Sequence, residues 1–156
     1  MKPITVVIET PKGSAQKYDF DEKLKGYCLR KVLPAGMVFP YDFGFIPKTK
    51  ADDGDPIDVI VLSEFKSFSG CIMRCRIIGA IRAKQQDGKK MIENDRFIAV
   101  PEATLVYKNI GSVEDLPKQF IDELQEFFIN YNKLEGKKFE PVAVLNQKKA
   151  TQLLKK

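Results

Sequence analysis

The first two-thirds of the chain alternates short apolar runs with turn residues, a pattern typical of β-strands. The opening run is β-branched and ends at a turn cluster that contains Pro11 and Gly13. The candidate strands are residues 4–9, 17–20, 27–33, 39–46, 57–62, 71–83 and 96–100. Short strands separated by regular turn signals predict a closed or partly open β-barrel.

The last third changes to a helical period. Apolar residues recur three and four positions apart over residues 120–134, which predicts a long helix with its apolar stripe against the barrel. We expect this helix to begin near residues 112–115, which carry a capping-box pattern, and to end near Gly136. Asn146 is expected to cap a short terminal helix through Leu154. The predicted fold is mainly β with two helices, in a single domain of residues 1–156.

Composition limits the chemistry. The 156 residues include no histidine, which excludes Ser-His-Asp and Cys-His nucleophiles and zinc hydrolases with histidine ligands. An enzyme with this sequence must work with carboxylates, lysine, arginine and tyrosine. Such an inventory suits hard, oxygen-bound cations such as Mg²⁺.

Net charge and cysteine content bear on the binding partners and the cellular compartment of the protein. The net charge of +5 is compatible with nucleic acid, a membrane surface or a small anionic substrate as partner, but a solvated surface and a basic tail account for most of the lysines. The three cysteines, Cys28, Cys71 and Cys75, are a poor disulfide framework because their number is odd and their spacing irregular. No run of about 18 apolar residues and no signal-peptide pattern occur. We therefore expect a cytoplasmic protein with no membrane partner.

Four aspartates crowd into the seven residues directly before an apolar strand: Asp52, Asp53, Asp55 and Asp58. Like charges repel, so such a cluster disfavours folding unless a cation neutralises it. A calcium EF-hand is excluded, because Asp58 stands where that loop needs glycine and an apolar strand follows. From the residues alone, a surface acidic turn and a metal site both remain open.

The sequence Asp-Gly-Asp-Pro-Ile-Asp at residues 53–58 resembles the Asp-x-Asp-Pro-x-Asp signature of the family I soluble inorganic pyrophosphatases. Further matches follow in the family's order, at residues 6–11, 17–18, 39–47, 94–101 and 127–131. The resemblance extends over residues 6–139. It implies an OB-like five-stranded barrel with helices packed outside.

The resemblance also implies a reaction centre built on divalent cations. Asp53 and Asp58 match metal ligands, and Asp55 matches the general base that takes the proton of the attacking water. Glu9 matches a carboxylate that engages a further metal or its water, and an ordinary strand-end glutamate is equally consistent with its position. The implied cofactor is Mg²⁺, as two or more ions, with Mn²⁺ as a candidate substitute.

Two further metal-binding aspartates of the family are hard to align, because residues 84–90 form a longer segment than is usual. We predict Asp95 as a metal ligand and Asp87 as the other carboxylate. Asn94, next to Asp95, stands in the strict alignment column.

Substrate contacts are expected from six residues: Lys17, Arg30, Lys31, Arg96, Tyr131 and Lys133. Lys17 matches a phosphate-binding lysine of the family, and Tyr131 matches a tyrosine that donates a hydrogen bond to the substrate.

Several positions depart from the family pattern. Lys31 stands for an arginine, and lysine cannot form the two-pronged contact that arginine makes with phosphate. Phe43 stands for a tyrosine, Asp19 for a glutamate and Asn132 for a lysine. Each lost phosphate contact is expected to cost about 1.5–3 kcal/mol, which weakens turnover without abolishing it.

These features predict a magnesium-dependent hydrolase that cleaves pyrophosphate into two orthophosphates. One alternative is a hydrolase of another small phosphoanhydride. A second is a non-catalytic OB-fold module that binds nucleic acid, although the acidic loop would repel a phosphate backbone. The resemblance further implies a homo-oligomer, most commonly a hexamer, and no nucleic-acid partner.

Overall fold

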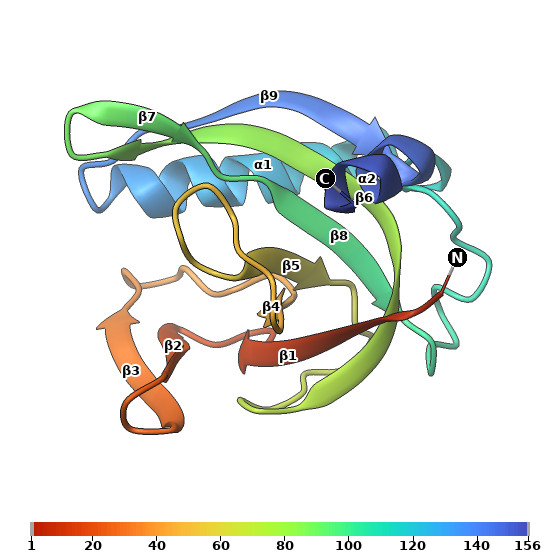
Figure 1. Ribbon diagram of the computed structural model, residues 1–156, viewed down its shortest axis with the longest axis horizontal. Helices are drawn as coiled ribbons and strands as arrows, with labels where there is room; N and C mark the ends of the chain where they lie inside the picture. The colour runs from red at the N-terminus through yellow and green to blue at the C-terminus, as the bar shows by residue number, and fades with distance from the viewer. Residues whose placement is uncertain (1, 156) are drawn as a thin grey trace.

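Five strands close into a barrel within residues 2–155, the part of the chain that the computed structural model describes. Their order around the barrel is β1 (Ile4–Thr10), β4 (Asp42–Ile46), β5 (Ile57–Val61), β8 (Arg96–Pro101) and β6 (Ile72–Asp87) (Figure 1). Pairing of β6 with β1 closes the ring, and β5 and β8 run parallel. The predicted OB-like five-stranded barrel is therefore confirmed.

Four more strands extend this frame. β2 (Gln16–Asp21) and β3 (Gly26–Val32) form a separate antiparallel hairpin, whereas β7 (Lys90–Glu93) and β9 (Phe139–Asn146) both pair with β6. The sequence analysis did not predict β7 and β9. β7 is only four residues long and β9 contains a proline, so their own side chains give little strand signal.

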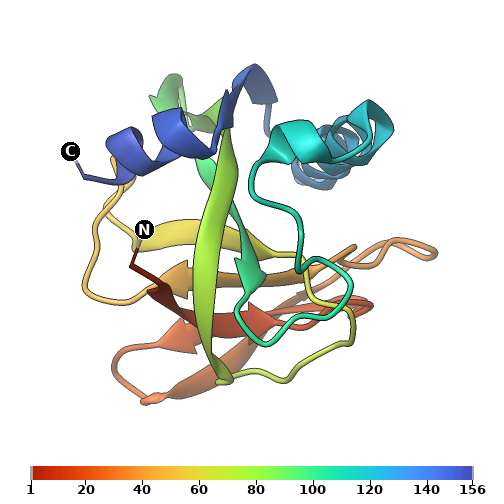
Figure 2. The ribbon, with the colours of Figure 1, turned by 90° about the vertical axis from the view of Figure 1, so that its right-hand side faces the viewer.

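Two apolar clusters form the core. One draws residues from all five barrel strands and from the terminal helix, for example Val6, Val59 and Ala150, and it fills the barrel. The other lies between the barrel wall and the long helix, and it includes Ile98 and Phe128. Figure 2 shows both helices on the same side of the barrel, with β6 running up the front of the barrel between them. The apolar side of the long helix therefore packs against one wall of the barrel.

The helices begin and end close to the predicted residues. Ser112 and Asp115 form the capping box, but it caps a short 3-10 turn, η1 (Val113–Asp115), because Pro117 separates that turn from α1 (Lys118–Lys133). The Asn146 side chain caps α2 (Gln147–Leu154), as predicted. No helix within residues 2–155 is both long and apolar enough to cross a bilayer.

Candidate active site

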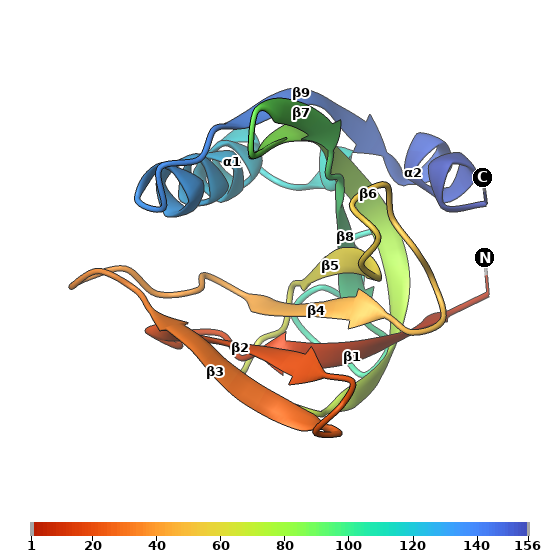
Figure 3. The same cartoon turned by 60° about the vertical axis from the view of Figure 1, so that its left-hand side comes forward.

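A cavity of about 410 Å³ lies between the barrel, the β2–β3 hairpin and α1. Its walls come from β1, β2, β3, β4, β5, β6, β8, α1 and the connection between β4 and β5. Figure 3 shows α1 on one side of β4 and β5 and the β2–β3 hairpin on the other. Segments far apart in the sequence thus meet at one site.

The acidic wall of the cavity is the turn that precedes β5. Gly54 takes a φ of +89°, a conformation that glycine adopts without strain. The turn is closed by backbone hydrogen bonds from Ala51 N to Asp55 O (2.7 Å) and from Gly54 N to Ala51 O (2.9 Å). The Asp55 N–H also donates to Asp53 Oδ1 at 3.0 Å. Both aspartates line the cavity, and partial burial together with the Asp53 charge raises the pKa of Asp55.

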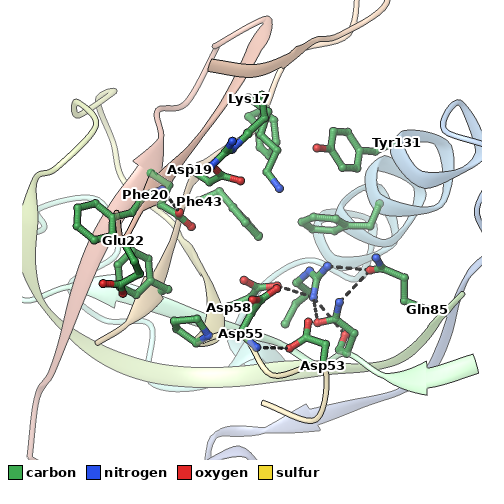
Figure 4. A pocket seen from close by; sticks show the side chains of 18 residues that line it. Lys17, Asp19, Phe20, Glu22, Phe43, Asp53, Asp55, Asp58, Gln85 and Tyr131 are labelled. Atoms are coloured by element: carbon green, nitrogen blue, oxygen red, sulfur yellow. Dashed lines mark hydrogen bonds and ion pairs between the residues drawn. The ribbon is translucent and has the colours of Figure 1, made fainter. Parts of the chain in front are cut away.

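Asp58 lies on the same wall, but it already has a cationic partner. The parallel register of β5 and β8 sets Asp58 beside Arg96, and their side chains form an ion pair of 2.7 Å between Oδ2 and Nη1. Burial raises the pKa of Asp58, and the Arg96 charge opposes that rise. Figure 4 shows Asp53, Asp55 and Asp58 gathered at one side of the cavity.

Glu9 projects from β1 and is also partly buried. Its Oε2 accepts the Phe20 N–H at 2.7 Å. Burial raises the pKa of Glu9 to about 7, although that hydrogen bond and the Lys17 charge oppose the rise. Glu9 is therefore a carboxyl group that the cavity holds close to its protonation point at neutral pH.

The opposite side of the cavity carries cationic and hydroxyl groups. Figure 4 shows Lys17 from β2 and Tyr131 from α1 on the side of the cavity away from Asp53, Asp55 and Asp58, with the Tyr131 hydroxyl directed toward Lys17. Arg30 from β3 also lines the cavity, and its guanidinium pairs with Asp19 and, at 3.2 Å, with Asp21. Because these two carboxylates already neutralise Arg30, Lys17 is the cation on this side that forms no ion pair within residues 2–155 and is available to an anion.

Tyr131 has an unsatisfied hydroxyl. Within residues 2–155, its Oη is buried and has no hydrogen-bond partner. Burial raises the pKa of the phenol, so the group stays a proton donor at neutral pH. Buried polar atoms normally have a hydrogen-bond partner, and one without a partner in the protein is expected to bond to a ligand or a water molecule. A ligand oxygen in the cavity would be such a partner.

Eight of the predicted site residues come together in this cavity: Glu9, Lys17, Arg30, Asp53, Asp55, Asp58, Arg96 and Tyr131. The other four do not line it. Asp87 is exposed at the tip of the β6–β7 hairpin. Asp95 pairs with Arg82 at 3.3 Å and accepts the Ala83 N–H at 3.2 Å, whereas its neighbour Asn94 does line the cavity. Successive residues of an extended chain point to opposite faces, which explains the difference.

The two remaining lysines also lie outside the lining. Lys31 pairs with Glu135, and its Nζ lies 3.9 Å from the centre of the Tyr131 ring. It therefore contacts the Tyr131 ring without lining the cavity. Lys133, the last residue of α1, is exposed.

Among the polar residues that line the cavity, the sequence analysis gave no indication of Gln85 and Glu22. Gln85 lies on β6, and its Oε1 accepts hydrogen bonds from Asn94 Nδ2 (3.0 Å) and Arg96 Nη2 (3.1 Å). Only the register of the β6–β7 hairpin brings these positions together, so no local motif could have indicated them.

A family model described as inorganic pyrophosphatase matches residues 6–156. The chain belongs to the inorganic pyrophosphatase family. This confirms the resemblance drawn from residues 53–58. The sequence is 41% identical over 138 residues to an inorganic pyrophosphatase of Haloferax volcanii, covering 88% of this chain and 76% of that protein. It is 37% identical to one of Halalkalibacterium halodurans over 153 residues, covering 98% of this chain and 91% of the relative.

The fold agrees with that membership. The crystal structure of inorganic pyrophosphatase from Thermus thermophilus superposes with a TM-score of 0.89 at 32% identity, covering 97% of this chain and 86% of that one. The Thermus thermophilus protein therefore has the same fold as this chain, whose barrel and α1 form the cavity.

The cavity of this pyrophosphatase-family chain has an excess of negative charge. Its lining holds six acidic side chains, Glu9, Asp19, Glu22, Asp53, Asp55 and Asp58, and three cationic ones, Lys17, Arg30 and Arg96. The whole chain, by contrast, has a net charge of +5. A local excess of carboxylates beside a cavity is stabilised by bound cations.

The donor set fits a divalent cation of the kind that the family implies. Carboxylate oxygens are the protein ligands that Mg²⁺ and related hard cations prefer. Within residues 2–155, no three acidic or cysteine side chains already form a group able to enclose an ion. Mg²⁺ commonly keeps several waters and takes substrate phosphate oxygens as ligands, so a complete protein shell is not required.

Proposed function

We propose that this protein hydrolyses inorganic pyrophosphate to two orthophosphates, with Mg²⁺ as cofactor. The observation that carries the proposal is the arrangement of the cavity: Asp53, Asp55 and Asp58 lie on one side and Lys17 and Tyr131 on the other, with Arg30, paired with Asp19, also in the lining. A phosphate-sized anion needs the second side, and divalent cations need the first. Family membership supports the same reaction.

Asp53, Asp58 and Glu9 are the proposed metal-binding residues, for two or more Mg²⁺ ions, and Mn²⁺ has similar ligand preferences. Asp87 and Asp95 are not included, because neither lines the cavity. When bound, such ions neutralise phosphate charge and lower the pKa of water. The carboxylates on this wall hold that positive charge next to the cavity.

Asp55 is the proposed general base. It lines the cavity without an ion pair to a lysine or arginine among residues 2–155, in contrast to Asp58. Its pKa lies above the usual range because of partial burial and the Asp53 charge, which makes its carboxylate a better proton acceptor. It would take the proton of the water that attacks phosphorus.

Lys17, Arg30, Arg96 and Tyr131 are the proposed substrate-binding residues. Lys17 and Arg30 would neutralise the phosphate oxygens, and the Tyr131 hydroxyl would donate the hydrogen bond that it does not make within the chain. These groups would also stabilise the phosphate that leaves, since charge shifts onto its bridging oxygen in the transition state. Lys31 and Lys133 are not included, because they do not line the cavity.

The test is phosphate release from pyrophosphate, with Mg²⁺ and with a chelator, by the unaltered protein and by Asp55→Asn. Loss of a general base typically costs about 10²–10⁴-fold in rate, so the variant should retain less than about 1% of the activity. Asp52→Asn is the matched control, because Asp52 is an exposed aspartate of the same turn that does not line the cavity. It should keep normal activity.

Other substrates are distinguished by the same assay. Faster phosphate release from tripolyphosphate than from pyrophosphate would favour the broader phosphoanhydride hydrolase. Metal-independent binding of an oligonucleotide, without phosphate release, would favour the nucleic-acid-binding module.

Assembly and location are also part of the proposal. Large apolar side chains are exposed on two neighbouring surface segments: Phe65, Phe68, Ile72, Leu105 and Val106. Burial of such residues between subunits would support the homo-oligomer, a hexamer, that the family resemblance implies. Analytical ultracentrifugation of the purified chain measures the subunit number. Cell fractionation tests the expected cytoplasmic location.

A further inference from the structure

Arg96 is a buried cationic side chain in the wall of an acidic cavity, which is an unusual position for an arginine. Only 7% of its side chain is exposed, against 21% for its partner Asp58. A buried charge is costly unless it is paired and hydrogen-bonded. The contacts of Arg96 therefore indicate what keeps it there.

Two amide side chains fix the guanidinium. Arg96 Nη1 donates to Asn94 Oδ1, and Nη2 donates to Gln85 Oε1 at 3.1 Å. Asn94 Nδ2 donates in turn to the same oxygen of Gln85 at 3.0 Å. Since arginine can only donate, both amides must present their oxygens to it. Asn94 and Gln85 thus form an acceptor pair for one cation.

Aromatic rings surround the rest of the side chain. The guanidinium carbon lies 5.8, 5.3 and 5.6 Å from the ring centres of Phe43, Phe128 and Phe139. These rings come from three elements: Phe43 from β4, Phe128 from α1 and Phe139 from β9. Packing on several sides restricts the rotamers of Arg96, so its charge stays beside Asp58.

We propose that Arg96 is a resident cation that holds the Asp58 carboxylate before any divalent ion binds, with Gln85 and Asn94 as its positioning residues. This inference rests on the proposed function, in which Asp58 binds metal. An incoming ion that binds Oδ2 shares that oxygen with the guanidinium, and one that binds the other oxygen of Asp58 still meets the positive charge of Arg96. The protein without substrate therefore binds divalent ions more weakly than its six acidic lining residues suggest.

Mn²⁺ binding without pyrophosphate tests the proposal directly. Titration calorimetry is performed on the unaltered protein, on Arg96→Met and on Arg82→Met. One neighbouring charge typically shifts an equilibrium at a carboxylate by about one pKa unit or more, so Arg96→Met should bind Mn²⁺ about tenfold more tightly. Arg82→Met carries the same loss of charge, but Arg82 pairs with Glu93 and Asp95 and does not line the cavity. It should change the affinity less than twofold.

A polar variant guards against misfolding of Arg96→Met. Arg96→Gln removes the charge but can still donate to Asp58, and it should also bind Mn²⁺ several-fold more tightly. Thermal melting checks that each variant is folded. If both neutral variants bind Mn²⁺ with the affinity of the unaltered protein, the proposal is wrong.

A double-mutant cycle tests the role of Gln85. Gln85→Met should loosen the guanidinium and tighten Mn²⁺ binding about threefold, the effect expected from a net hydrogen bond of ordinary strength. The same substitution in Arg96→Gln should have no effect on Mn²⁺ affinity. An equal effect in both backgrounds would show that Gln85 does not act through Arg96. Failure of the proposed function is recognised separately, as absence of phosphate release by the unaltered protein with Mg²⁺.

Discussion

Replacement of Glu9 by glutamine is expected to change how the stability of the metal-free protein depends on pH. Glu9 is partly buried on β1, and burial raises its pKa from 4.5 to about 7. Its Oε2 accepts the Phe20 N–H, and the amide oxygen of glutamine can accept the same bond. Glu9→Gln therefore removes the ionisation with little change in shape.

The direction of the pH dependence of stability follows from proton binding to Glu9 in the folded and unfolded states. The folded protein keeps a proton on Glu9 that the unfolded chain releases between about pH 4.5 and pH 7. The contribution of Glu9 to stability is thus complete below about pH 4.5 and is lost as the pH rises through 7. A shift of this size corresponds to about 3 kcal/mol at full loss, since one pKa unit is about 1.4 kcal/mol.

Urea unfolding in the presence of a chelator, at a fixed chain concentration, measures the effect. At pH 5, Glu9→Gln should be more stable than the unaltered protein by only about 1 kcal/mol or less. At pH 8, the variant should be more stable by up to about 3 kcal/mol. Glu22→Gln is the matched control, because Glu22 lines the same cavity but is exposed. A stability gap between Glu9→Gln and the unaltered protein that is the same at both pH values would refute the reasoning.

Three further substitutions test other parts of the structure. Tyr131→Phe removes a hydroxyl that has no partner within residues 2–155, so thermal stability should not fall, whereas KM for pyrophosphate should rise about tenfold or more. Gly79→Ala brings a methyl group within 2.4 Å of a Val113 methyl carbon, and denaturant unfolding should detect a loss of about 1–3 kcal/mol. Asn146→Ala removes the side chain that accepts the Lys149 N–H at 3.1 Å, and the same assay should detect a loss of about 1 kcal/mol. Unchanged KM in the first case, or unchanged stability in the other two, would contradict these expectations.

The elements that could be predicted from the sequence are those whose own side chains are apolar and buried, either as a continuous run or as a stripe on one face. The strand at residues 57–62 and the apolar stripe of α1 are examples. β9 was missed because it contains Pro141 and several exposed residues, and its pairing with β6 does not depend on an apolar pattern of its own. Pro117 separates η1 from α1, a division that the capping box alone could not indicate.

The candidate site shows the same division between local and long-range information. Residues 53–58 carry a contiguous motif, so Asp53, Asp55 and Asp58 could be found from the sequence. Asn94 and Gln85 are nine positions apart and meet through a hydrogen bond across the β6–β7 hairpin. Without that register, Asp95 is an equally good candidate, and the one-residue difference decides which side chain lines the cavity.

Phosphate release as a function of Mg²⁺ concentration tests most directly that the acidic cavity works through divalent cations. The purified protein should release two phosphates for each pyrophosphate consumed, with a rate that rises as Mg²⁺ is added and falls to background when a chelator removes it. Release that continues unchanged in the chelator, or no release at any Mg²⁺ concentration by a folded protein, would contradict the proposed function.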